Sequence, residues 1–234
     1  NSRTGDAFGV PFGSLRDPKG CPRPARAVRE KFRPAVVFVM GPPGSGKSTQ
    51  AQVLSGQFGL ERIKTGSILR ELGKSSSARG RSIKARIDVG RLAPPPLVAE
   101  LVLQKLRRVL ARGVGVVFDG SPRTLYEVEL LLDALKGTHA PRILVVFLDV
   151  PQPETVRRIM SRWACEDCKL EIPLGDITPK RCVVCGGKVV RREDDREDIA
   201  GDRWTEYTFR TLPVIHYLER RGFVTRINGD RPIA

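Results

Sequence analysis

The sequence has no apolar run of the roughly 20 residues that a membrane-spanning helix needs, and its first residues lack the apolar segment of a signal peptide. Aromatic residues make up only 6% of the chain, and no aromatic-rich ribonucleoprotein motif accompanies its basic residues. These basic residues are scattered along the chain and form no polybasic block. We therefore expect a cytoplasmic protein that neither enters a membrane nor binds nucleic acid directly.

What the chain does have is positive charge, with 41 Lys and Arg against 26 Asp and Glu and a formal net charge of +15. Such an excess favours anionic partners, among which compounds with several phosphates are an alternative to nucleic acid. The length of 234 residues suits one medium domain with insertions or two small domains. Residues 1–34 are rich in Gly, Pro and Arg without an apolar period, and they are expected to form a disordered or targeting leader.

Four of the five cysteines form two C-x-x-C pairs, Cys165 with Cys168 and Cys182 with Cys185. Residues 169–181 separate the pairs, a gap close to that of four-cysteine zinc sites, so the pattern favours structural Zn²⁺ over disulfides. The alternative is a reduced, metal-free set of thiols. The surrounding segment has too few apolar residues to hold a core without a metal, which supports the zinc interpretation.

The most informative stretch runs from a short apolar segment, residues 35–40, into the phosphate-loop pattern G-x-x-x-x-G-K-[ST] at residues 41–48. Glycines allow the backbone N–H groups of such a loop to face a polyphosphate at a helix N-terminus. Lys47 is expected to reach the terminal phosphates, and the Ser48 hydroxyl to lie close to Mg²⁺. The pattern predicts that the chain binds a nucleoside triphosphate.

Further apolar runs at residues 115–118, 142–149 and 223–227 alternate with helical periods at residues 48–57, 97–110, 125–136 and 197–221. This alternation predicts an α/β fold with a parallel sheet flanked by helices. Asp119 follows the second strand directly, where a carboxylate that organises Mg²⁺ belongs in a phosphate-loop fold. Thr65 is expected to cap the helix that begins the segment T-G-S-I-L-R.

In their order along the chain, the motifs GPPGSGKSTQ, TGSILR and DGSPRT, the four cysteines and R-x-D-D at residues 192–195 resemble those of the adenylate kinase family. The resemblance is to its long-lid, zinc-binding bacterial type, and it covers nearly all of residues 36–233. It implies a phosphate-loop core with two inserted parts, which divide the chain into a leader (1–34), core (35–64), acceptor-binding arm (65–94), core (95–161), zinc lid (162–197) and core (198–234).

The resemblance further implies reversible transfer of a phosphoryl group from MgATP to AMP, giving two ADP, by a monomeric enzyme with a structural Zn²⁺. Matching positions assign catalytic roles to Lys47, Asp119, Arg123, Arg158, Arg162, Arg192 and Arg203. The implied ATP site comprises Gly44, Ser45, Gly46, Lys47, Ser48, Thr49, Arg158, Arg162 and Arg231. The implied AMP site comprises Thr65, Arg70, Arg91, Leu92, Ala93, Gly120, Arg123, Glu127, Arg192 and Arg203.

The chain departs from the family pattern mainly around the acceptor. Ser67 stands at a usual Asp, Ser121 at a usual Phe, and Glu127 at the Gln that reads the adenine of AMP. An ionised Glu only accepts hydrogen bonds, so it suits guanine or cytosine at least as well as adenine. One interpretation is weaker discrimination against GMP and CMP, and the other is that Glu127 turns away from the base and leaves specificity unchanged.

Two other function classes remain open on the sequence alone. The first is a related kinase that uses GMP or CMP as the acceptor. The second is a zinc-ribbon phosphate-loop ATPase that acts on nucleic acid, although the arginine set suits a small diphosphate bridge better. An acceptor panel and a test for DNA- or RNA-stimulated ATPase activity distinguish the three classes.

Overall fold

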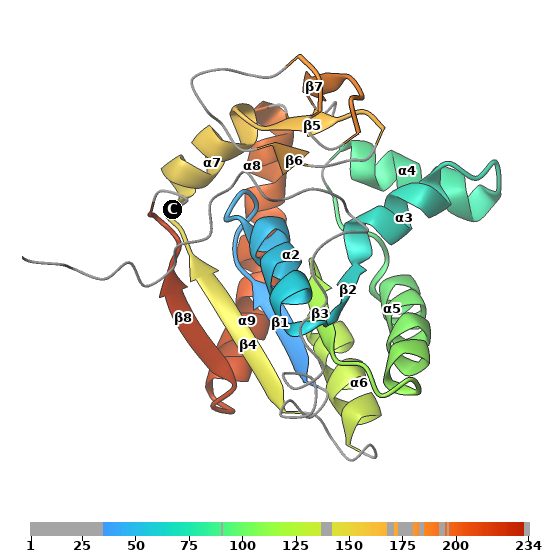
Figure 1. The fold of residues 1–234 in the computed structure, drawn as a ribbon, viewed down its shortest axis with the longest axis vertical. Coiled ribbons are helices and arrows are strands. Elements are labelled where there is room, and N and C mark those ends of the chain that lie inside the picture. Colours follow the sequence, from blue (N-terminus) through green and yellow to red (C-terminus); the bar gives the residue numbers. More distant parts are fainter. Residues whose placement is uncertain are drawn as a thin grey trace, which may run out of the picture.

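The computed structural model in Figure 1 describes residues 35–89, 91–136, 142–167, 171–172, 180–182, 185–191, 195 and 197–231. The expected leader at residues 1–34 lies outside the described residues, as do Cys168 and Arg192. None of the helices in the described ranges has the length and hydropathy of a membrane-spanning segment.

The described residues form a central parallel sheet in the order β2-β3-β1-β4-β8, and a small antiparallel sheet in the order β6-β5-β7. The central strands are β1 (Val36–Met40), β2 (Glu61–Lys64), β3 (Val116–Asp119), β4 (Ile143–Asp149) and β8 (Val224–Asn228). The strands of the small sheet are β5 (Trp163–Cys165), β6 (Glu171–Ile172) and β7 (Val189–Arg191). The parallel sheet flanked by helices confirms the α/β phosphate-loop fold predicted from the sequence.

Helices connect the strands and cover both faces of the central sheet (Figure 1). They are α2 (Lys47–Phe58), α3 (Thr65–Gly73), α4 (Ala78–Asp88), α5 (Pro95–Leu110), α6 (Leu125–Leu135), α7 (Gln152–Met160), α8 (Glu197–Glu206) and α9 (Leu212–Glu219). A π-helical turn at Tyr207–Thr211 joins α8 to α9, where the sequence suggested one continuous α-helix.

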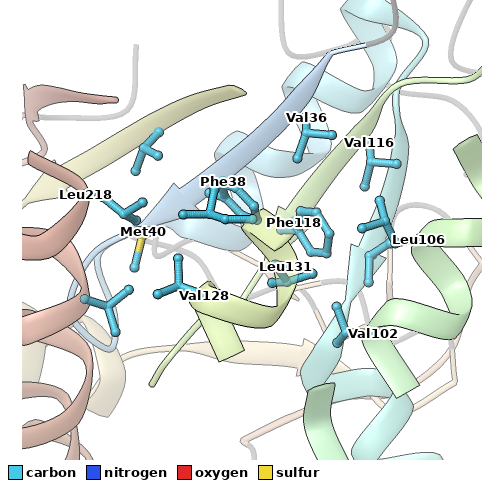
Figure 2. Close-up of a cluster of buried hydrophobic side chains, with 14 of the residues drawn as sticks. Val36, Phe38, Met40, Val102, Leu106, Val116, Phe118, Val128, Leu131 and Leu218 are labelled. Atoms are coloured by element: carbon cyan, nitrogen blue, oxygen red, sulfur yellow. The ribbon is translucent and has the colours of Figure 1, made fainter. Parts of the chain in front are cut away.

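Strand β1 lies at the centre of the molecule because both of its faces are apolar. Val36, Phe38 and Met40 face the cluster formed with α5, α6 and α9, and the ring of Phe38 stacks on that of Phe118 at 4.8 Å between centroids (Figure 2). Val37 and Val39 point to the opposite face, which α2 covers. Side chains alternate between the faces of a strand, so this short apolar run fixes the strand that carries the phosphate loop.

The pair α3–α4 and the small sheet β6-β5-β7 extend from the end of the central sheet at which its strands finish (Figure 1). Ligands of open parallel sheets bind at this carboxyl end of the strands. The chain therefore places its two peripheral parts around the edge of the sheet that also holds the phosphate loop and Asp119.

Candidate active site

The phosphate loop leaves the buried strand β1 and enters α2 through backbone conformations that favour glycine. Gly44 and Gly46 have φ angles of 79° and 89°, and a Cβ atom on Gly44 would lie 2.6 Å from the backbone oxygen of Thr155. Only glycine is compatible with this conformation and this close approach to α7. The Lys47 amine, at the first residue of α2, donates to the Pro42 backbone oxygen at 2.5 Å.

Ser48 and Asp119 meet next to this loop. The Ser48 hydroxyl lies 3.0 Å from each carboxylate oxygen of Asp119, which ends β3 beside β1. A hydroxyl in the first turn of α2 and a carboxylate at the carboxyl end of β3 are oxygen groups of the kind that Mg²⁺ prefers. These residues therefore fit the Mg²⁺ that accompanies ATP in phosphate-loop enzymes.

The loop after β3 carries Arg123 at its centre. The Arg123 guanidinium donates through Nε to the Gly120 backbone oxygen at 2.8 Å. Burial lowers the pKa of Arg123, and the positive charge of Arg203 lowers it further, whereas the Glu127 carboxylate acts in the opposite direction. An arginine retains its charge despite such a shift, so Arg123 is a partly desolvated cation in the loop that follows Asp119.

Glu127 lies in the first turn of α6 and is only 2% exposed. Its carboxylate accepts from the Ser121 hydroxyl at 2.9 Å, the Arg123 backbone N–H at 3.0 Å and the Thr124 hydroxyl at 3.2 Å. The Thr124 oxygen in turn accepts from the Glu127 backbone N–H, which makes Thr124-x-x-Glu127 a helix capping pair. Burial raises the pKa of Glu127 while these three hydrogen bonds oppose the rise. The carboxylate thus holds the loop that carries Arg123.

Two arginines of the predicted catalytic set converge on Asp195, whose side chain is 2% exposed. Arg162 donates to Asp195 through Nε at 2.8 Å and through a second, shorter contact from Nη2, and the Nη1 of Arg203 lies 3.2 Å from Asp195. Arg158, on α7, donates to Glu154 at 2.6 Å. Hydrogen bonding by Arg157 and Arg158 lowers the pKa of Glu154 to about 2. Carboxylates therefore hold these guanidiniums in place.

On the arm, Thr65 is the first residue of α3 and Lys64 occupies the N-cap position, so the prediction that Thr65 caps this helix is wrong. The reason is that β2 runs directly into α3 without a connecting residue. The Thr65 hydroxyl is buried and has no hydrogen-bond partner among the described residues. A buried hydroxyl of this kind suits a ligand contact.

Four further predicted acceptor residues lie on α3 or after α4. The Arg70 guanidinium approaches Gly66, where a Cβ atom would lie 3.3 Å from its Nη1. After α4, Arg91 is exposed, Leu92 is half-buried and Ala93 is buried. The structure thus brings Arg91–Ala93 to the connection between the α3–α4 pair and α5.

Arg231 is exposed and follows the carboxyl end of β8. Beside it, a shallow groove of about 390 Å³ is lined by Asp149, Pro151, Arg226, Ile227, Asn228 and Asp230. This groove lies at the same end of the sheet as the phosphate loop, because β4 and β8 are both parallel to β1.

The thiols of Cys165, Cys182 and Cys185 lie within 4.8 Å of one another, and those of Cys165 and Cys185 are 3.4 Å apart. Gly186 adopts a φ of 74° at the turn after Cys185, a conformation that favours glycine. Three converging thiols, with Cys165 at the end of β5 and Cys182 and Cys185 before β7, fit one tetrahedral Zn²⁺ together with a fourth ligand. Cys168, the predicted fourth ligand, lies outside the described residues.

Sequence reasoning assigned no role to two residues that the structure places at the site. Arg62, on β2, forms an ion pair with Asp119, and Asp195 holds Arg162 and Arg203. No local pattern identifies Arg62. Asp195 belongs to the R-x-D-D motif. The motif singled out this residue but did not indicate that Arg162 and Arg203 would pair with it.

The strand–loop–helix at β1 and α2, the Ser48–Asp119 pair and the surrounding arginines define a phosphate-loop phosphotransferase of the nucleoside monophosphate kinase class. Residues 39–223, well over half of the chain, match the sequence profile described as Adenylate kinase. The chain belongs to the adenylate kinase family.

Individual relatives agree with the profile. An adenylate kinase of Chlamydia pneumoniae is 36% identical over 196 residues, which cover 84% of this chain and 91% of that protein. Adenylate kinases of Archaeoglobus fulgidus and Caldicellulosiruptor saccharolyticus are 34% and 33% identical, and the matches cover 92% and 93% of those proteins. The kinase interpretation is therefore favoured over a zinc-ribbon ATPase that acts on nucleic acid.

Proposed function

We propose that this protein catalyses reversible phosphoryl transfer between MgATP and AMP, as a monomer in the cytoplasm. The observation that carries the proposal is the convergence of the phosphate loop, the Ser48–Asp119 pair and Arg123 at one end of the sheet. The curated relatives, which are named adenylate kinases, support the same substrates.

In this proposal the backbone N–H groups of Gly44, Ser45, Gly46 and Thr49, together with Lys47, hold the donor phosphates. In-line phosphoryl transfer requires positioning and charge stabilisation more than acid–base chemistry. Ser48 and Asp119 would hold the Mg²⁺ of MgATP, which would supply positive charge to offset that of the phosphates. Arg231 and the groove beside it are assigned to the part of ATP remote from the transferred group.

The arginines supply the remaining positive charge. Arg123, Arg158, Arg162, Arg192 and Arg203 are assigned to the transferring group, because a guanidinium binds phosphate oxygens in pairs and stays charged. Arg70 is assigned to the phosphate of AMP, and Thr65, Arg91, Leu92, Ala93 and Gly120 to the rest of the acceptor. Arg192 is included on the sequence alone. Glu127 contributes by holding the loop of Arg123.

The arm at residues 65–94 and the lid at residues 162–197 are proposed to close over the two nucleotides and exclude water, since water would otherwise accept the phosphoryl group. One Zn²⁺ bound by Cys165, Cys168, Cys182 and Cys185 is proposed to fix the lid. The three converging thiols support this assignment.

The proposal is tested with the purified full chain, ATP and each of AMP, GMP, CMP and UMP in a coupled assay for ADP. The expected result is the highest kcat/KM with AMP and no stimulation by DNA or RNA. If kcat/KM is highest with another monophosphate, that monophosphate and not AMP is the acceptor. ATP hydrolysis that depends on nucleic acid, without transfer to any monophosphate, would refute the proposal.

A further inference from the structure

Arg62 lies on the edge strand β2, one residue before the buried Ile63. Side chains alternate along a strand, so Arg62 points to the face of the sheet opposite Ile63. Ile63 packs into the cluster with α5 and α6, whereas Arg62 approaches Gln52 on α2 with its Nη1, 3.4 Å from the amide oxygen. Arg62 is thereby placed beneath the first turns of α2, next to the phosphate loop.

On this face Arg62 forms an ion pair with Asp119. Its Nη2 lies 2.5 Å from Oδ2 of Asp119, and the two side chains are only 18% and 5% exposed. The same carboxylate accepts from the Ser48 hydroxyl, so both oxygens of Asp119 are engaged. Charge-assisted hydrogen bonds at such distances are among the strong ones in proteins.

The guanidinium is incompletely satisfied in this arrangement. Its Nε is buried without a hydrogen-bond partner among the described residues, and the contact with Gln52 is long. An arginine with one strong hydrogen bond and an unpaired buried N–H group is less stabilised than an arginine that donates two parallel hydrogen bonds to a carboxylate. The contact with Asp119 Oδ2 therefore accounts for most of the stabilisation of this cation.

We propose that Arg62 is a positioning residue that holds Asp119 when no nucleotide is bound and competes with Mg²⁺ for its carboxylate. This inference rests on the proposed function, in which Ser48 and Asp119 face the metal of MgATP. Arg62 and a metal ion bound at this site would both engage the Asp119 carboxylate, so engagement by one cation would weaken engagement by the other. The ion pair keeps the carboxylate aimed at Ser48 before the metal arrives, and it raises the metal concentration that the enzyme needs.

The test measures metal binding directly, without turnover. Mn²⁺ is titrated by electron paramagnetic resonance into the full chain saturated with an ATP analogue whose β,γ-bridging oxygen is replaced by nitrogen. Arg62→Gln is expected to bind Mn²⁺ about ten- to 150-fold more tightly than the unmodified protein, the range for releasing one hydrogen bond to a charged group. The Mg²⁺ concentration for half-maximal kinase activity is expected to fall in parallel.

Arg112→Gln is the matched control. Arg112 is an exposed arginine that pairs with Glu61, the residue next to Arg62, so the variant removes the same charge from the same strand region without touching Asp119. Its Mn²⁺ affinity is expected to stay within twofold of the unmodified protein. If Arg62→Gln does not fold, as judged by its thermal unfolding, Arg62→Met takes its place with the same expectation.

Asp119→Asn separates this inference from the proposed function. It is expected to weaken Mn²⁺ binding, and Arg62→Gln added to it is expected to have no further effect. If Asp119→Asn weakens binding but Arg62→Gln alone changes it by less than twofold, the competition is refuted and the metal site stands. If the tightening by Arg62→Gln persists in full without the Asp119 carboxylate, Arg62 acts only through its charge and the inference fails. If Asp119→Asn has no effect, the metal assignment of the proposed function falls as well.

Discussion

Replacement of Glu127 tests whether this buried carboxylate supports the catalytic loop or reads the acceptor base. Glu127→Ala removes the acceptor of the Ser121 hydroxyl and of the Arg123 backbone N–H. Each buried donor left without a partner costs about 1–3 kcal/mol, and relief of burying a carboxylate offsets part of this cost. We expect the free energy of unfolding to fall by about 2–4 kcal/mol in total. In a chain of this size each kcal/mol lowers Tm by about 2–4 °C.

Glu127→Gln is expected to behave differently. Its amide oxygen can still accept from Ser121 and the Arg123 N–H, and its NH₂ group can donate to the Thr124 oxygen once that hydroxyl rotates. The free energy of unfolding should therefore stay within about 1 kcal/mol of the unmodified protein. Because Glu127 does not present its carboxylate to a base in this arrangement, the ratios of kcat/KM for AMP, GMP and CMP should not change.

The pH dependence provides a second measurement on the same pair of proteins. Burial raises the pKa of Glu127 in the folded state, so the folded protein binds more protons than the unfolded chain between the ordinary Glu pKa and the raised value. Stability contributed by Glu127 is therefore lost as the pH rises through this window. Relative to the unmodified protein, Glu127→Gln should gain stability over the same window, measured by urea unfolding at a series of pH values.

Two results would refute this account. One is a Glu127→Ala variant as stable as the unmodified protein, because the three hydrogen bonds would then contribute nothing. The other is a Glu127→Gln variant with a large shift in the AMP, GMP and CMP ratios at unchanged stability, because Glu127 would then read the base.

Three further substitutions test other parts of the site. Lys47→Ala is expected to lower kcat by at least about 10²-fold while Tm stays nearly constant, because the lysine stabilises charge that develops in the transition state; near-normal turnover would disprove its assignment. Elemental analysis of the unmodified protein is expected to find about one Zn²⁺ per chain, which Cys182→Ser should lose, with residues 162–197 becoming more sensitive to protease than the core. Cys21→Ser, at the one cysteine outside the two C-x-x-C pairs, should keep the metal. Asp195→Asn should lower the free energy of unfolding by about 2–3 kcal/mol, less than for a fully buried pair because Arg162 and Arg203 remain 20% and 18% exposed. Asp133→Asn, at an exposed ion pair, should change it by less than about 1 kcal/mol, and equal effects of the two variants would contradict the importance of Asp195.

The parts of the molecule that sequence predicted well are those fixed by local patterns. The run at residues 36–40 predicts a strand buried on both faces because every residue in it is apolar, and the fold confirms it. The phosphate-loop pattern spans only eight residues, and it predicts both the glycine turn and the start of the helix that carries Lys47 and Ser48. Asp119 is located by the end of a strand, and parallel topology then brings it beside Ser48.

The parts that sequence did not predict depend on contacts between residues far apart in the chain. Arg62 and Asp119 are 57 positions apart, and Arg162 and Asp195 are 33 apart. Which cation meets which carboxylate follows from the strand order β2-β3-β1 and from the long-range packing that brings Arg162 and Asp195 together. Neither can be read from a short stretch of sequence. The role of Glu127 was detectable, because Thr124-x-x-Glu127 has the capping-box spacing.

The same contacts explain why the site tolerates so many like charges before substrate arrives. Arg62 is paired with Asp119, Arg158 with Glu154, and both Arg162 and Arg203 with Asp195. Each carboxylate offsets the repulsion among the guanidiniums and orients its own partner. In the proposed function, contacts with phosphate oxygens or Mg²⁺ replace these bonds. The free energy of nucleotide binding is then the difference between a free state, in which the arginines pair with carboxylates, and a bound state, in which they pair with phosphates. It is therefore smaller than the full strength of the phosphate contacts. An enzyme that must release its products as readily as it binds its substrates is served by that difference.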